Sequence, residues 1–135
     1  MKTFTETTPE VKQWVKEKIE LTELNKVIDF KVISSLDSKE TVVLQKANPL
    51  LQYFADAEII VIVNEDILSM LDEKQKEIVI DEALAHVSYD YEKEKISLSK
   101  PDLSTFTRIL RRYDFPEYDR LQETLKSIRE QLKLK

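Results

Sequence analysis

Hydrophobic residues recur with a helical period in the first part of the chain, and this predicts a helix from about Pro9 to Leu21. The apolar side of that helix is formed by Val11, Trp14, Val15 and Ile19. Thr8 can cap its start, and proline suits the first turn because the missing N–H has no helical partner there. The first regular element is therefore expected to be an amphipathic helix.

The pattern then changes to one that predicts strands. A strand is expected from Val27 to Ile33, followed by a turn over Leu36 to Glu40 and a returning strand from Thr41 to Gln45, as in a hairpin. A short helical segment should follow from Asn48 to Phe54. The clearest strand runs from Glu58 to Val63, because its five consecutive β-branched residues favour burial on both faces.

Helical periodicity returns after this strand. A short helix is expected from Asp66 to Leu71. A longer one should run from Asp72 to about Tyr89, because Asp72 and Gln75 form the pattern of a capping box and the apolar residues that follow indicate a largely buried helix. The polar segment from Tyr91 to Leu98 is expected to be extended, as one arm of a hairpin. The last helix should begin at Pro116.

The composition is that of a globular protein. Hydrophobic residues make up 41% and charged residues 35% of the 135 residues, which suits one domain spanning residues 1–135. The net charge of −5 disfavours nucleic-acid binding, because a phosphate backbone needs cations to neutralise it. The absence of cysteine excludes disulfides and thiolate metal ligands, and makes a reducing cytoplasm the expected location. No segment has the apolar run of a signal peptide or a membrane span.

The chain also contains no glycine. Glycine-rich loops that hold phosphates in nucleotide-binding proteins are therefore excluded. Asn, Asp, Ser and Pro are expected to form the turns instead.

The only histidine, His86, lies at the end of a segment with the outline of a zinc-binding helix. In the H-E-x-x-H pattern, two histidines four residues apart bind one metal ion, and the glutamate beside the first histidine acts as general base. The matching positions here are Glu82-Ala83-Leu84-Ala85-His86. The second histidine is kept, the first is a carboxylate, and the base is replaced by a methyl group.

The residues around this segment resemble the phage metallopeptidases, a small zincin-like family. The resemblance rests on the apolar strand before Asn64, on Asp81–His86, on Pro101-Asp102-Leu103-Ser104-Thr105-Phe106 and on Ile109-Leu110-Arg111-Arg112. It covers about residues 56–115. It implies an α+β fold, a minimal zincin-like single domain in which a small sheet packs against the motif helix. The N-terminal helix and the C-terminal helix over about 116–134, both expected from periodicity, are additions to this core. The resemblance also implies a phage or prophage protein in the cytoplasm of a bacterial host.

This chain departs from the family pattern at three functional positions. The family has its first histidine where this chain has Glu82, its catalytic glutamate at Ala83, and its third histidine at Pro101. Ala83 cannot take a proton from a metal-bound water, and Pro101 has no side-chain donor. Asp102 ends a capping-box pattern that starts at Ser99, so it can simply serve a helix start. We therefore expect no peptidase activity and no zinc cofactor.

His86 leaves two interpretations open. In the preferred one, it is a hydrogen-bonded residue on the inner side of the helix and pairs with Glu82 one turn earlier, without metal. In the other, His86 and Glu82 are metal ligands that need a third donor, for which Asp102, Asp90 and Glu92 are the candidates.

The last helix carries a second candidate site. Its apolar residues recur at alternating spacings of three and four, as in a coiled-coil seam. The seam consists of Tyr118, Leu121, Leu125, Ile128 and Leu132. It could bind a partner protein or a second copy of the chain. The preferred alternative is that the seam packs onto Trp14 and the N-terminal helix.

The favoured function is a catalytically inactive metallopeptidase-like domain that binds or assembles with another protein. One alternative is a divergent metallohydrolase that uses Glu82 and His86. The other is a small scaffold or regulatory protein unrelated to peptidases. Neither nucleic acid nor a membrane is expected as a partner.

Overall fold

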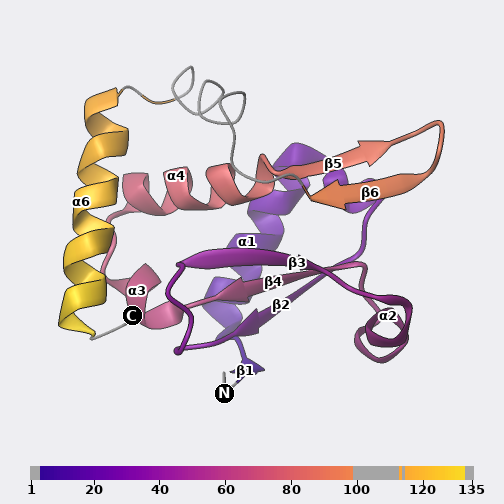
Figure 1. Cartoon of the computed structure of the whole chain (residues 1–135), viewed down its shortest axis with the longest axis horizontal. Helices are drawn as coiled ribbons and strands as arrows, with labels where there is room; N and C mark the ends of the chain where they lie inside the picture. Colours follow the sequence, from indigo (N-terminus) through magenta and orange to yellow (C-terminus); the bar gives the residue numbers. More distant parts are fainter. Residues whose placement is uncertain (1–3, 99–112, 114, 133–135) are drawn as a thin grey trace.

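A four-stranded mixed sheet forms the centre of the fold (Figure 1). The structure, a computed structural model, describes residues 4–98, 113 and 115–132. The strands lie in the order β1 (Thr5–Glu6), β2 (Phe30–Ser34), β4 (Ile59–Val63) and β3 (Val42–Lys46). β2 and β4 are parallel, whereas β1 is antiparallel to β2 and β3 is antiparallel to β4.

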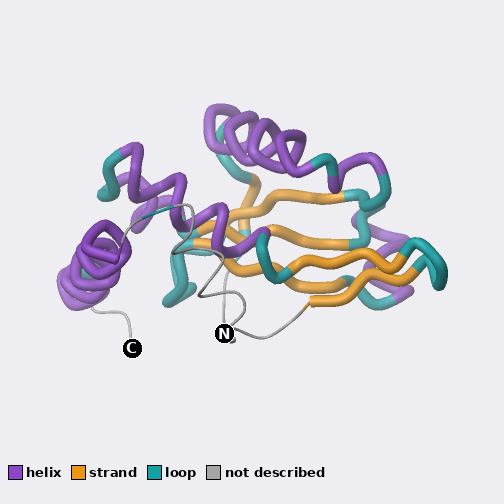
Figure 2. Tube along the Cα trace, turned by 90° about the horizontal axis from the view of Figure 1, so that it is seen from above, coloured by secondary structure: helices purple, strands orange, loops and turns teal. Residues whose placement is uncertain are grey.

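Helices and a separate hairpin surround this sheet, which confirms the predicted α+β fold. The described helices are α1 (Pro9–Thr22), the short 3₁₀ helix η1 (Leu24–Lys26), α2 (Pro49–Ala55), α3 (Glu65–Ser69), α4 (Glu73–Leu84) and α6 (Phe115–Gln131). β5 (Val87–Asp90) and β6 (Lys95–Leu98) form the antiparallel hairpin. Seen from above, α6 lies at one end of the molecule and the hairpin reaches toward the other (Figure 2). No helix within the described residues is long and apolar enough to cross a membrane.

All five residues of β4 are buried, which agrees with its position inside the sheet. Such a strand needs cover on both faces, and a central position also pairs both of its backbone edges. The strand predicted at Glu58–Val63 is confirmed and begins at Ile59. The predicted hairpin between the two preceding strands is wrong, since β4 lies between β2 and β3 and pairs with both.

The loop formed by residues 35–41 crosses the end of β4 to join β2 to β3. The backbone N–H of Asn64 donates to the carbonyl of Thr41 at 2.8 Å. The Asn64 side chain is fully buried, and its Nδ2 donates to the carbonyls of Leu36 at 3.2 Å and Ser38 at 2.7 Å. Its Oδ1 caps α3. One side chain therefore fixes both the loop and the start of the next helix.

α1 and α4 cover one face of the sheet. Their inner residues share a core cluster with β4, formed by Val15, Ile19, Ile80, Leu84, Val61 and Val63. Burial of each such side chain is worth about 1.5–3 kcal/mol, so this cluster is a main source of stability. The predicted N-terminal helix is confirmed at Pro9–Thr22. The Thr8 hydroxyl, however, donates to Glu65 at 2.7 Å and does not cap α1.

α4 begins with the predicted capping box but ends earlier than predicted. The predicted end near Tyr89 is wrong, because α4 ends at Leu84 and the chain enters β5 at Val87. Val87 is buried in a core cluster that includes β6, and it pairs with Leu98. This tertiary packing outweighs continuation of the helix. His86 therefore lies in the turn that follows α4.

α6 packs into the core against α3 and α4. The residues of its seam are buried or half-buried there, and these are Tyr118, Leu121, Leu125, Ile128 and Leu132. The predicted contact with Trp14 is wrong, because Trp14 packs in the cluster around α1. Partner binding by the seam stays a prediction, and within the chain the seam belongs to a core cluster. Its side chains fill the space beside Ile78 and Val79 and are not free.

Residues other than glycine occupy the left-handed backbone positions. These are Glu23 (φ 64°), Asp56 (φ 54°) and Glu94 (φ 52°). Glu23 and Asp56 end α1 and α2, where a left-handed residue satisfies the last helical carbonyls. The turn residues expected from the sequence did not include glutamate, which has no side-chain preference for this conformation.

Candidate functional site

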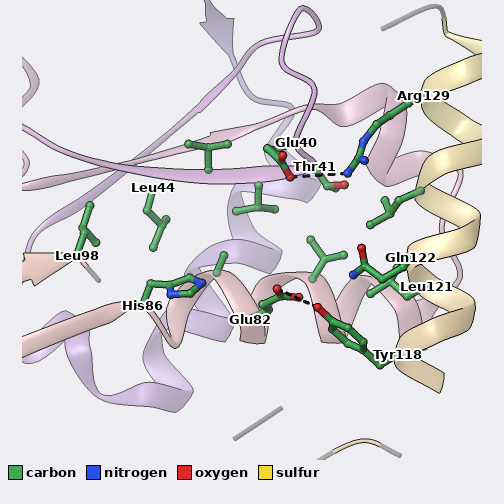
Figure 3. A pocket seen from close by; sticks show the side chains of 15 residues that line it. Glu40, Thr41, Leu44, Glu82, His86, Leu98, Tyr118, Leu121, Gln122 and Arg129 are labelled. Atoms are coloured by element: carbon green, nitrogen blue, oxygen red, sulfur yellow. Dashed lines mark hydrogen bonds and ion pairs between the residues drawn. The ribbon is translucent and has the colours of Figure 1, made fainter. Parts of the chain in front are cut away.

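A groove lies between β3 and α4, and α6 closes one end of it (Figure 3). Its volume is about 340 Å³, which suits a small molecule or a short peptide segment. Residues 40–44 line one side, and α4 with its following turn lines the other through Val79, Glu82, Ala83 and His86. The remaining lining residues come from β6 and α6, and are Leu98, Tyr118, Leu121, Gln122, Leu125 and Arg129.

The side of the groove formed by β3 is a sheet edge. β3 pairs with β4 and, within the described residues, with no other strand. Thr41 and Ala47 bond to the β4 side through their backbone groups, at 2.8 and 2.9 Å. Because these groups alternate in direction along an antiparallel strand, those of Val42 and Leu44 point away from β4. The groove is therefore bounded by backbone donors and acceptors that lack a strand partner in the described part of the chain.

Glu82 lies near the middle of the groove and contacts α6. Its Oε1 accepts a hydrogen bond from the Tyr118 hydroxyl at 3.4 Å (Figure 3). Burial raises the pKa of Glu82 above its ordinary value; the Tyr118 bond opposes this and the charge of Glu40 adds to it. Burial, followed by the charge of Glu82 and the shared hydrogen bond, raises the pKa of Tyr118. The pair therefore holds a carboxyl that retains its proton to higher pH than an exposed one.

His86 lines the same groove near Leu44 and Leu98, at the end away from α6 (Figure 3). The predicted Glu82–His86 pair is not formed among the described residues, where the carboxylate of Glu82 accepts a hydrogen bond from Tyr118 instead. The helix ends between the two residues, so His86 no longer follows the helical spacing that the pairing assumed. Both residues still face one groove, as their spacing in the sequence suggested.

The donors described in the groove do not fit a zinc site. An open zinc site takes three protein ligands. No three His, Cys, Asp or Glu side chains gather in that way within the described residues. Ala83 lines the groove at the position of the family's catalytic base and brings only a methyl group. These residues support no reaction step through a metal.

The other predicted site residues lie elsewhere or outside the described residues. Asp90 and Glu92 are exposed at the end of β5 and in the turn after it, away from the groove lining. They are therefore unsuitable as the third ligand in this structure. Pro101 and Asp102 lie outside the described residues.

The end of the groove at α6 contains polar residues that the sequence did not reveal. Arg129 donates from Nε to the carbonyl of Lys39 at 3.0 Å, and its Nη2 lies 3.7 Å from the Glu40 carboxylate. Thr41 lies beside them in the lining. The predicted seam of the last helix did not include Arg129, and no pattern indicated that the 35–41 loop would meet it. Only the crossing of that loop over β4 brings these residues together.

The small α+β domain has a sheet edge beside α4, which carries Glu82 and Ala83 and is followed by His86. This arrangement has the outline of a domain related to metallopeptidases. The family comparison agrees with this class. The model of the family described as Putative phage metallopeptidase matches residues 3–129, and the chain belongs to this family. The match is longer than the 56–115 region predicted from the motifs and takes in α1 and most of α6. Searches of curated proteins and of solved structures gave no match.

Proposed function

We propose that this domain binds an extended segment of a partner protein in the groove between β3 and α4 and leaves that segment uncut. The observation that carries the proposal is the edge of β3 along the groove, which has no strand partner in the described part of the chain. An extended peptide can add to such an edge as a further strand, with backbone hydrogen bonds for affinity and pockets for its side chains. The domain would act as a binding or assembly module in the cytoplasm of a bacterial host.

The composition of the groove supports binding without hydrolysis. Ala83 cannot act as a general base, and Glu82 is held by Tyr118. The family's third histidine is replaced by Pro101, which has no donor atom. The domain would therefore work without a zinc cofactor.

A divergent metallohydrolase is the second candidate. Glu82 and His86 line one groove, and burial raises the pKa of the Glu82 carboxyl, which suits proton transfer better than an exposed carboxyl does. This candidate needs a third ligand such as Asp102 and a base other than Ala83. The metallohydrolase is the weaker candidate because it needs more groups than the peptide-binding domain does.

A pool of random N-acetylated hexapeptides, offered to the immobilised full chain, tests both parts of the proposal. We expect the wild type to retain a subset of the pool, and mass spectrometry should find the retained peptides intact. Val42→Pro should lose retention because it removes an outward N–H at the first residue of β3, where proline is tolerated. The matched control Val42→Ala removes similar packing and keeps the N–H, so it should retain the peptides.

Two results would count against the proposal. Equal retention by the two Val42 variants, both folded, would exclude strand addition at β3. Cleavage of peptides that depends on added zinc and is lost in His86→Ala would favour the metallohydrolase instead.

A further inference from the structure

We infer that the end of the groove at α6 is a carboxylate subsite, in which the Thr41 hydroxyl and the Arg129 guanidinium hold the C-terminal carboxylate of the bound segment. This inference rests on the proposed peptide binding. It specifies which part of a partner enters the groove, namely a free C-terminus and not an internal stretch of chain.

Thr41 provides the first observation. The residue is only 3% exposed and lines the groove. Its Oγ1 has no hydrogen-bond partner within the described residues. A buried hydroxyl without a partner is unfavourable, and a valine would fill the same space without that penalty. A ligand that supplies an acceptor at this point would satisfy the hydroxyl.

Arg129 provides the second observation. The bond from its Nε to the carbonyl of Lys39 orients the guanidinium. The 3.7 Å separation between Arg129 and Glu40 exceeds hydrogen-bond length, and the Glu40 side chain is 65% exposed. An exposed ion pair of this kind contributes little. A ligand carboxylate can therefore take the place of Glu40, since arginine binds carboxylates through paired N–H donors.

Thr41, before β3, and Arg129, on α6, line the same end of the groove. Figure 3 shows Thr41 and Glu40 above this end and Arg129 reaching toward them from α6. Thr41 belongs to the loop that Asn64 holds across β4, and its backbone carbonyl is fixed there at 2.8 Å from the Asn64 N–H. Both donors are thus attached to rigid parts of the fold.

The direction of β3 brings a C-terminus to this end. β3 runs from Val42 to Lys46, and Thr41 precedes it. A segment that adds antiparallel to β3 runs the opposite way, so its last residue arrives beside Thr41 and Arg129. The distance from Leu44 to Thr41 is roughly 10 Å at the usual rise per residue, so about three residues of the partner would fill the groove.

Two matched peptide pools test this subsite on the full chain. Both contain random N-acetylated hexapeptides, one with free C-terminal carboxylates and the other with C-terminal carboxamides. We expect the wild type to retain the carboxylate pool about tenfold more strongly, as for the loss of a hydrogen bond to a charged group. Added salt should weaken the carboxylate pool more than the carboxamide pool.

Three single variants separate binding from folding. Thr41→Val should keep or raise the melting temperature and lower retention of the carboxylate pool several-fold, because it removes only the hydroxyl. Arg129→Gln should retain the two pools equally. Glu40→Gln should strengthen retention of the carboxylate pool, since the competing carboxylate is gone.

Each contrary result has a definite meaning. Equal retention of both pools by the wild type would overturn the carboxylate subsite and leave strand binding in place. A Thr41→Val variant that melts at lower temperature and binds as well as the wild type would give the hydroxyl a structural role and overturn the subsite too. Retention of neither pool would remove both the peptide groove and its subsite.

Discussion

Glu82 lies on α4 and is half-buried beside α6. Its neighbours Tyr118 and Glu40 shift its pKa in opposite directions. Burial and the charge of Glu40 favour its neutral form, whereas the hydrogen bond from Tyr118 favours its charged form. Because burial is the largest of these effects, the pKa of Glu82 is raised above 4.5. The folded chain then binds this proton more tightly than the unfolded chain. Stability from this group is therefore lost as pH rises from about 4.5 through the pKa of the folded state.

Glu82→Gln removes this titration while keeping a side chain of similar shape. We expect the melting temperature of the variant, relative to that of the wild type, to increase steadily as pH is raised from about 4.5 to about 7.5. Circular dichroism at a series of pH values measures it. Glu123→Gln, on the exposed side of α6, is the control and should show no such trend. A difference between Glu82→Gln and wild type that is the same at every pH would contradict the raised pKa.

Among elements, α6 lies where the sequence predicted a helix, but its seam packs against α3 and α4 and not against the N-terminal helix. Its seam has the spacing of a coiled coil, yet Leu121 is fully buried and Leu125 is 6% exposed within one chain. Gln75 of α4 donates to Thr124 of α6 at 3.1 Å, which adds a polar link beside the apolar contact. α6 is thus part of the core and closes the groove.

The double variant Leu121→Glu/Leu125→Glu tests this position of α6. We expect it to unfold, because two unpaired charges would enter the core. Truncation of one buried leucine already lowers the free energy of unfolding by about 2–5 kcal/mol, out of a total of about 5–15 kcal/mol. Circular dichroism and sedimentation measure the result. Lys126→Glu, on the exposed side, should stay folded. A folded, monomeric double variant of a dimeric wild type would restore the seam as an interface.

The elements that the sequence predicted well are those whose signals are local. The capping box of α4, the proline at the start of α1 and the apolar run of β4 each depend on a few adjacent residues. The pairing of β2 with β4 and the early end of α4 depend on contacts between distant residues, which periodicity does not contain. In the groove, Glu82 and His86 followed from the motif. Thr41 and Arg129 did not, because a loop and a late helix meet there only in three dimensions.

For the whole molecule, membership of the phage metallopeptidase family allows a test of whether the family's metal-binding positions still converge in this chain. The triple variant Glu82→His/Ala83→Glu/Pro101→His restores the family residues. If positions 82, 86 and 101 still converge, we expect the variant to gain zinc affinity over the wild type, because an open zinc site needs three protein ligands. Metal analysis of protein purified without a metal-affinity tag measures both. Adding His86→Ala to the triple variant should abolish the gain. A folded triple variant without zinc would show that these positions no longer converge.

β4 is inserted between two strands that precede it in the chain, and this sets an order of assembly. During synthesis, β2 and β3 leave the ribosome before the strand that both of them pair with. A nascent chain that joined β2 directly to β3, as the local pattern favours, would have to open again before β4 could enter. The sheet therefore closes only after Val63 has emerged, through contacts between distant residues that slow folding. A chain interrupted before Ile59 would carry the edges of this sheet without its centre.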